Sequence, residues 1–215
     1  MIKHMTKLII IRHGESEANE LGVIAGWNDY KLTALGLEQA EETAAHLVAT
    51  EKIDVVCSSD LCRASATAKA CADKLGLTVQ TYPELRETYC GEWEGKTFAE
   101  VEARDVEEYA RFKRFQLIYT LPEGENLWES GIRFYNKALE IAKENEGKTI
   151  VIAAHGAVIR VFWALICNTP KEEATAKHDY ASNASYSVAT FDGERFTPVE
   201  YSHDSHLTHA THLHI

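Results

Sequence analysis

The amino-acid sequence predicts an α/β fold: a three-layer α/β/α sandwich with a mostly parallel central sheet and a mid-chain helical insertion. Short continuous apolar runs, typical of strands buried on both faces, alternate along the chain with segments of helical periodicity. The 215 residues, 45% of them hydrophobic, can bury one sizeable core. We therefore expect a single domain over residues 1–215.

Strands and helices alternate in the first part of the chain. Residues 7–11 form a buried strand that stops at Arg12, and residues 53–57 form the next one. Thr33 is the expected N-cap of the helix between them. The expected apolar face of that helix carries Leu37, Ala40, Ala44, Leu47 and Val48. Ser58-Ser59-Asp60 should then cap a helix over residues 61–75, which a short strand at 77–81 follows.

The segment from about residue 83 to residue 124 is less regular. Thr97 and Glu100 match a capping box, the stretch after them is highly charged, and Pro122-Glu123-Gly124 is typical of a turn. No low-complexity linker separates this segment from its neighbours. We expect it to be a helical insertion that lies over the sheet and covers the active site.

The last part of the chain returns to the strand and helix pattern. A long helix is expected over residues 126–145, a strongly buried strand over 149–154 and a further helix over 158–167. Two final strands, near residues 185–191 and 195–201, should be joined by a turn at Asp192-Gly193.

Composition excludes some classes of protein. A net charge of −11 argues against nucleic-acid binding, because no broad basic field is present to displace counterions from a phosphate backbone. No apolar run is long enough for a membrane helix, and the first residues lack a signal peptide, so the mature protein should begin near Met1. Five cysteines without a disulfide-framework spacing favour a reducing, cytoplasmic location. The oligomeric state stays open, with a homodimer as one alternative.

Reactive side chains follow three separate strand ends. Arg12 and His13 end the first strand, Ser58 leads to Arg63 after the second, and His155 ends the buried strand at 149–154. The carboxyl ends of parallel strands meet at one edge of a sheet, so these groups should converge. Guanidinium groups match phosphoryl oxygens, and the glycines after the two histidines, Gly14 and Gly156, would expose backbone N–H donors. The pattern predicts a phosphate cradle.

The same residues lie in motifs that resemble those of a known family. Ile11-Arg12-His13-Gly14-Glu15-Ser16 with Asn19 looks like the signature of the histidine phosphatase superfamily, the phosphoglycerate mutase-like proteins. The resemblance continues in the family's order over most of the chain. The further motifs are Gly26-Trp27-Asn28-Asp29, Leu32-Thr33-Ala34-Leu35-Gly36, Ser58-Ser59-Asp60-Leu61-Cys62-Arg63-Ala64, Leu85-Arg86-Glu87, Gly91-Glu92-Trp93-Glu94-Gly95 and Ala154-His155-Gly156-Ala157-Val158-Ile159-Arg160.

This resemblance implies an enzyme that acts on a small phosphorylated metabolite without metal or cofactor. His13 would be the nucleophile that becomes phosphorylated, and Glu87 the proton donor to the leaving oxygen. The remaining implied residues would bind the phosphoryl group or line its site: Arg12, Ser16, Asn19, Gly26, Arg63, His155 and Gly156.

Two activities remain open within this family. Phosphomonoester hydrolysis is favoured, because the chain is compact and the segments around Glu87 and around Glu123-Gly124-Glu125 resemble the phosphatase branch. A mutase would instead return the phosphoryl group to a second hydroxyl, which requires basic contacts to a substrate carboxylate. Arg111-Phe112-Lys113-Arg114 could supply them, although a charged helical face is the commoner meaning of such a run. Ala25 and Cys90 depart from the family's usual residues and leave the substrate open.

Three rival interpretations are weaker. Gly91-Glu92-Trp93-Glu94-Gly95-Lys96-Thr97 has three residues between its glycines, whereas a P-loop requires four. A non-catalytic phosphate-binding or scaffold module is opposed by the intact catalytic set. The histidine-rich C-terminus is expected to bind metal only adventitiously, since no carboxylate or cysteine is placed to complete a site. The family resemblance implies an alternative, a lid over the active site. The histidines of this C-terminus are His203, His206, His209, His212 and His214.

Overall fold

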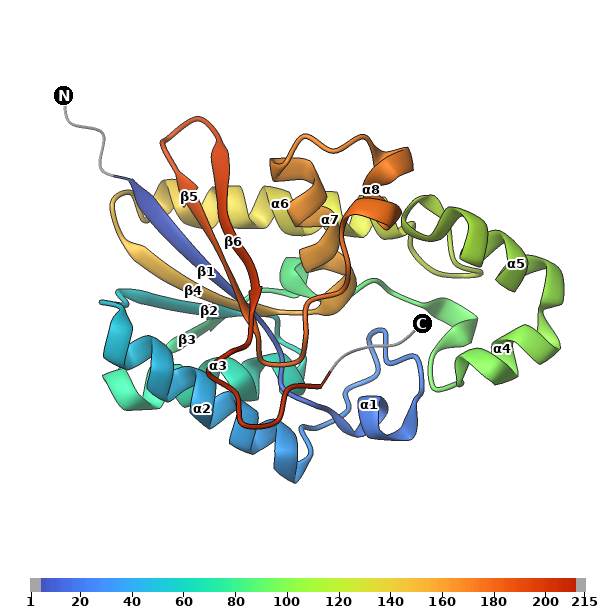
Figure 1. Cartoon of the computed structure of the whole chain (residues 1–215), viewed down its shortest axis with the longest axis horizontal. Coiled ribbons are helices and arrows are strands. Elements are labelled where there is room, and N and C mark those ends of the chain that lie inside the picture. The colour runs from blue at the N-terminus through green and yellow to red at the C-terminus, as the bar shows by residue number, and fades with distance from the viewer. Residues whose placement is uncertain (1–4, 212–215) are drawn as a thin grey trace.

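A six-stranded sheet forms the centre of the computed structural model, which describes residues 5–211 (Figure 1). The strands are β1 (Thr6–Arg12), β2 (Val55–Ser58), β3 (Val79–Thr81), β4 (Thr149–Ala154), β5 (Tyr186–Phe191) and β6 (Phe196–His203). Their order is β3-β2-β4-β1-β5-β6. The first four in this order are parallel, and β5 and β6 extend the sheet antiparallel. The predicted mostly parallel sheet is confirmed. The expected start at Met1, and His212 and His214, lie outside the described residues.

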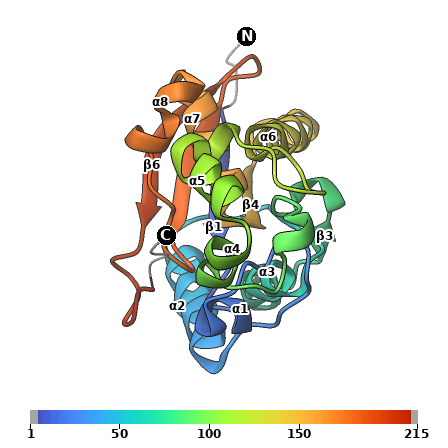
Figure 2. The ribbon, with the colours of Figure 1, turned by 90° about the vertical axis from the view of Figure 1, so that its right-hand side faces the viewer.

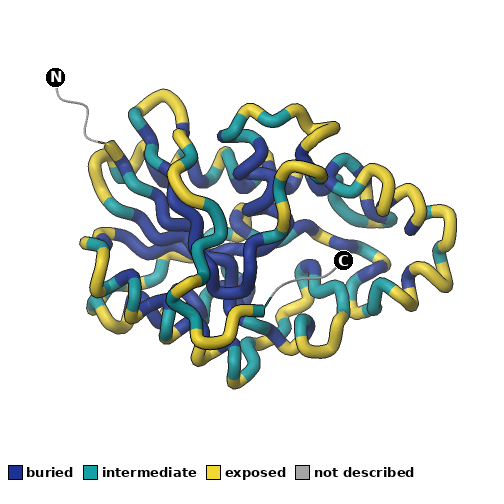
Figure 3. Tube along the Cα trace, viewed as in Figure 1, coloured by how far each residue is buried: buried dark blue, intermediate teal, exposed yellow. Residues whose placement is uncertain are grey.

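Helices cover both faces of the sheet, as the sandwich prediction requires. One face carries α2 (Ala34–Thr50) and α3 (Cys62–Leu75), and the other carries α6 (Leu127–Glu144) and α7 (Gly156–Ile166) (Figure 1). Side chains of β1 alternate between the two cores: Leu8 and Ile10 pack with α6 and α7, whereas Ile9 and Ile11 pack with α2 and α3. Burial on both faces explains the unbroken apolar run of this strand (Figure 3).

The helix starts predicted at Thr33 and near Asn126 are confirmed, whereas the cap predicted at Ser58-Ser59-Asp60 is wrong, because Leu61 is the N-cap residue of α3. The hydroxyl of Thr33 accepts from the backbone N–H of Gly36, and Asn126 caps α6. Asp60 does not cap α3, because its carboxylate forms an ion pair with Arg86 instead. Leu37 was expected on the buried face of α2 but is 52% exposed.

The mid-chain segment forms the predicted helical insertion. It contains α4 (Phe98–Arg104) and α5 (Val106–Phe115), and the capping box of Thr97 and Glu100 is present at the start of α4. These helices lie beyond the edge of the sheet at which β1 and β4 end (Figures 1 and 2). A third apolar cluster, which includes Trp93, Phe112 and Leu127, joins the insertion to α6 and α7.

Two short helices were not predicted from the sequence, α1 (Glu17–Leu21) and α8 (Lys171–Lys177). Helices of one to two turns leave too few residues for a periodic apolar pattern. No helix within residues 5–211 is long and apolar enough to cross a membrane. All five cysteines are free thiols.

Candidate active site

The structure brings the strand-end residues together. β1 and β4 are neighbours, with Arg12 opposite Ala154, so that His13 and His155 follow adjacent strand ends. Their ring centroids lie 5.2 Å apart. Arg63 comes from the first turn of α3, directly after β2. The predicted convergence at one edge of the sheet is therefore present.

His13 has a defined tautomer. Its Nδ1 lies 2.7 Å from the carbonyl oxygen of Gly14, which can only accept a hydrogen bond. Nδ1 therefore carries the proton, and Nε2 keeps its lone pair. Burial and the charges of Arg63 and Arg12 hold the pKa of His13 well below its usual range. The ring is neutral at pH 7, which leaves Nε2 available as a nucleophile.

His155 is buried beside His13, and neither of its ring nitrogens has a hydrogen-bond partner within residues 5–211. Burial, together with the charges of Arg63, His13 and Arg12, lowers its pKa well below the usual range. His155 is not among the residues that line the cavity, but its ring lies against that of His13, which does line it. A neutral, buried imidazole retains one N–H to donate to an anion.

These pKa directions predict that both rings stay neutral in mildly acidic solution. In the unfolded chain each ring protonates near its ordinary pKa of about 6.5, whereas in the folded protein protonation requires a lower pH. Their contribution to folding stability is thus full above that value and is lost as the pH falls below it. NMR titration of the ring Cε1–H signals, assigned with His13→Asn and His155→Asn variants, should show neutral-form shifts at pH 6. Midpoints near 6.5 would contradict this result.

Arg12 and Arg63 place two positive charges in the interior. Their exposed fractions are 3% and 1%, and neither forms a salt bridge with a described residue. Backbone carbonyls hold them: Arg63 donates to the oxygens of Gly26 and Asn28, at 2.7 and 2.9 Å. The Nε atoms of both arginines lack a partner in the described chain. Buried guanidinium groups without a carboxylate partner fit an anionic ligand.

Glu87 reaches this site from the loop before the insertion. Its carboxylate accepts hydrogen bonds from the backbone N–H groups of Thr88, Ala157 and Val158, at 2.9, 3.1 and 3.3 Å. Two of these donors belong to the first turn of α7, where the helix dipole favours a negative group. Glu87 lines the same cavity as His13 and both arginines.

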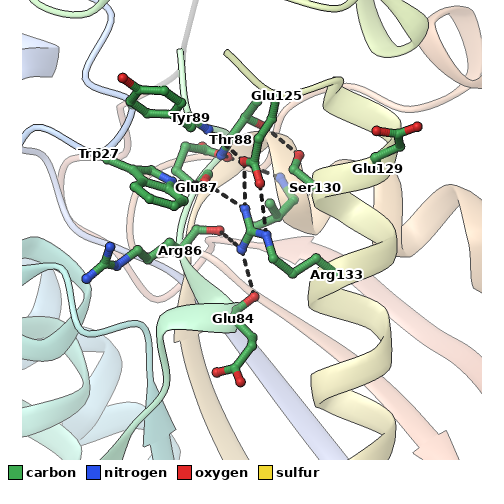
Figure 4. A network of polar contacts seen from close by, with 12 residues as sticks. Trp27, Glu84, Arg86, Glu87, Thr88, Tyr89, Glu125, Glu129, Ser130 and Arg133 are labelled. Carbon is green, nitrogen blue, oxygen red and sulfur yellow. Dashed lines mark hydrogen bonds and ion pairs between the residues drawn. The ribbon is translucent and has the colours of Figure 1, made fainter. Parts of the chain in front are cut away.

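A polar network fixes the backbone around Glu87 (Figure 4). The guanidinium of Arg133 donates to the carbonyl oxygens of Arg86 and Glu87, both at 3.0 Å, and pairs with Glu125. The indole N–H of Trp27 donates to the same carbonyl of Glu87 at 2.7 Å. These contacts restrict the position of the carboxylate. No motif marks Arg133 in the sequence, because it lies in the interior of α6.

The prediction that Gly14 exposes its backbone N–H to the bound group is wrong. The N–H of Gly14 is not exposed to the cavity, since it donates to Thr67 Oγ1 at 3.1 Å. A Cβ at this position would lie 2.3 Å from the carbonyl oxygen of Gly36, so the glycine permits close packing. Gly156 and Gly26 do line the cavity, and the carbonyl of Gly26 orients Arg63.

Ser16 and Asn19 form one wall of the cavity. Ser16 is the N-cap of α1, and Asn19 Oδ1 accepts from its backbone N–H at 3.0 Å. The amide of Asn183 donates to the carbonyl of His13 and to Asn19 Oδ1, at 3.1 and 3.3 Å. Asn183 was missed because it precedes β5, far along the chain from these residues, with no motif around it.

Apart from Thr88, the rest of the cavity wall consists of apolar and aromatic residues. Most of it comes from the loop before α2 and from the mid-chain insertion. The apolar lining residues are Val23, Ile24, Ala25, Cys90, Trp93, Phe98, Phe112, Leu121, Leu127, Ala157 and Tyr180. Tyr180 was not predicted. Arg111 and Lys113 do not line the cavity, and Arg111 pairs with Glu108 at 2.8 Å.

The described part of the C-terminus does not form a lid. No residue from 202 to 211 lines the cavity. Instead this segment packs along α2, where Thr208 hydrogen-bonds to Glu42 and the carbonyl of His209 accepts from Gln39. The lid prediction is therefore wrong for residues up to Thr211.

The fold and the site define a three-layer α/β protein with a buried histidine and arginine centre suited to a phosphoryl group. The chain belongs to the histidine phosphatase superfamily (branch 1), whose family model matches residues 8–204. This places it in a superfamily whose matched members include phosphatases and phosphoglycerate mutase-like proteins.

Individual relatives have related activities. Phosphoglycerate mutase-like protein 4 of Arabidopsis thaliana is 32% identical over 204 residues, which cover 94% of this chain and 86% of that protein. A metal-independent phosphoserine phosphatase of the same plant is 29% identical, covering 95% and 84%. The structure of a mycobacterial glucosyl-3-phosphoglycerate phosphatase with VO3 superposes with a TM-score of 0.82 at 27% identity, covering 92% of this chain and 99% of that one.

Proposed function

We propose that this chain is a metal-independent phosphomonoester hydrolase, a single cytoplasmic catalytic domain that acts on a small phosphorylated metabolite through a phosphohistidine on His13. The observation that carries the proposal is the neutral, buried His13, with a free lone pair on Nε2, beside two buried arginines that have no carboxylate partner among residues 5–211. Such a centre offers a nucleophile and a charge-compensating site for the same phosphoryl group.

In the first step, Nε2 of His13 attacks phosphorus and the bond from phosphorus to the ester oxygen breaks. The leaving oxygen takes a proton from Glu87 and departs as the alcohol. Arg12, Arg63 and His155 bind the three equatorial oxygens, over which charge is spread. The hydrogen bond from Nδ1 to the carbonyl of Gly14 stabilises the positive charge on the phosphorylated ring.

In the second step, water attacks the phosphohistidine and gives a proton to the Glu87 carboxylate. The bond from phosphorus to Nε2 breaks, inorganic phosphate leaves, and both side chains return to their starting states. The first step needs a protonated Glu87, and the second needs its carboxylate. The hydrogen bond with the backbone N–H of Ala157 keeps the side chain in place for both steps.

The cavity wall supports hydrolysis over mutase chemistry. Arg12 and Arg63 are its only cationic side chains within the described residues, and both belong to the phosphate site. Arg111, which could have bound a substrate carboxylate, lies outside the cavity. An apolar wall formed by Trp93, Phe112 and similar residues favours an ester whose alcohol part is apolar.

A substrate panel tests this proposal. Without added metal, kcat/KM for phosphate release from n-butyl phosphate should exceed that from glycerol phosphate by at least about tenfold. The reason is that each methylene buried in an apolar pocket stabilises the bound substrate. Both substrates are primary alkyl esters, so their leaving groups are matched. Conversion of 3-phosphoglycerate to 2-phosphoglycerate with little phosphate release would establish the mutase instead.

A further inference from the structure

Three histidines form a second cluster, away from the phosphate cavity. His46 lies on α2, His203 ends β6, and His206 follows in the C-terminal segment. A ring nitrogen of each lies within 4.8 Å of one from each of the others. The ring centroids are 5.0, 5.7 and 5.9 Å apart. Three imidazoles on one tetrahedral zinc ion would have centroids roughly 5.2 Å apart and nitrogens about 3.3 Å apart.

The centroid spacing is therefore close to that around one shared ion. The ring planes are nearly parallel, at 19°, 2° and 18° to one another, so the rings would turn on binding to aim their nitrogens at the ion. The other nitrogen of each ring is held by a neighbour. His46 Nε2 lies 3.1 Å from the Tyr186 hydroxyl, and His203 Nδ1 lies 2.6 Å from a carboxylate oxygen of Glu200. The Nε2 of His203 lies 2.9 Å from the Ser205 hydroxyl, which a bound ion would displace. Protein metal sites use such partners to orient their histidines.

The hydrogen bonds of His206 define which of its ring nitrogens is protonated. Its Nε2 lies 2.9 Å from Thr43 Oγ1, which in turn lies 2.8 Å from the carbonyl oxygen of Ala184. The same hydroxyl also lies 3.0 Å from the carbonyl oxygen of Gln39. Carbonyls cannot donate, so the hydroxyl hydrogen goes to one of these two oxygens, and His206 Nε2 is the donor to Thr43. Nδ1 of His206 then bears a lone pair, and it is buried without a partner within residues 5–211. Burial and the neighbouring imidazoles lower the pKa of this ring to about 4, which keeps it neutral.

We propose that His46, His203 and His206 bind one zinc-class divalent ion, with water in the fourth position. Imidazole ligands suit zinc, copper and nickel. The site departs from the expectation of adventitious binding along the histidine-rich tail, because its first ligand comes from α2. This interpretation does not depend on the proposed catalytic activity.

Such an ion would join the C-terminal segment to the catalytic domain. The segment continues to Thr211, whose hydroxyl donates to Asn183 Oδ1 at 3.2 Å. Asn183 in turn donates to the carbonyl of His13. The metal would thus fix a segment that is two hydrogen bonds from the candidate nucleophile.

Zinc titration of the full chain tests the proposal. The protein should carry no affinity tag, be stripped with a chelator, and contain His212→Gln and His214→Gln to remove two further tail imidazoles. We expect calorimetry to show one zinc ion per chain with micromolar or tighter affinity, and a raised Tm. Cobalt should give the intense visible absorption of a tetrahedral site.

Substitution then assigns the ligands. His46→Gln and His203→Gln should each weaken zinc binding at least tenfold and abolish the cobalt band, while His209→Gln, an exposed histidine of the same segment, should leave both unchanged. Cooperative thermal unfolding without zinc confirms that each variant is folded. Zinc binding that survives His46→Gln, or that is absent once His212 and His214 are replaced, would overturn the proposal.

Discussion

His13→Ala is expected to lower kcat for phosphate release by at least about a thousandfold, because His13 supplies the only imidazole among the described residues that line the cavity. The fold should persist, since removing a neutral ring breaks a single hydrogen bond, to the carbonyl of Gly14. Phosphate or vanadate should still bind, because Arg12 and Arg63 remain. Steady-state kinetics and anion titration measure the two effects separately.

His178→Ala is the matched control for this variant. Like His13, His178 has a hydrogen-bonded ring, with Thr169 as its partner; it is half-buried and does not line the cavity. Its replacement should leave kcat within a few fold of the parent enzyme. Turnover that persists in His13→Ala would remove His13 from the mechanism.

Glu87→Gln is expected to have an effect that depends on the leaving group. An alkyl phosphate needs a proton on its departing oxygen, so kcat/KM should fall by about a hundredfold to ten-thousandfold. A 4-nitrophenyl ester leaves as a stable anion, and its kcat/KM should fall less than about tenfold by the same argument. This parameter reports the steps up to phosphorylation of His13, so slow hydrolysis of the intermediate does not obscure the comparison.

The two substrates also control for damage to the site. The substituted side chain would place an amide N–H₂ near backbone donors that now bind the carboxylate of Glu87, at Ala157 or Thr88. Any resulting displacement should impair both esters alike. Equal losses for the two substrates would show that Glu87 positions α7 and does not transfer the proton.

Much of the fold could be predicted because its strands are buried on both faces. The apolar runs at residues 7–11 and 149–154 coincide with β1 and β4, and the polar residues after them mark the edge where the site forms. The Thr33 cap was predictable because its signal is local. Asp60 was misassigned as a cap because its ion-pair partner, Arg86, is distant in sequence.

The candidate catalytic residues could be located from motifs, whereas their surroundings could not. Asn183 and Tyr180 approach the site from the far end of the chain, and nothing near them in the sequence marks that approach. The apolar wall is assembled from residues spaced irregularly along the insertion, such as Trp93 and Phe112. Likewise, His46 joins His203 and His206 only through tertiary packing.

The most direct test of the mechanism is to detect the covalent intermediate. The enzyme would be mixed with a 4-nitrophenyl ester, quenched in alkali within milliseconds, and digested for mass spectrometry, with His13→Ala treated in parallel. The mechanism predicts a phosphoryl group on Nε2 of His13, formed and lost at rates that match turnover. Rapid turnover without this adduct, or an adduct on another residue, would contradict it.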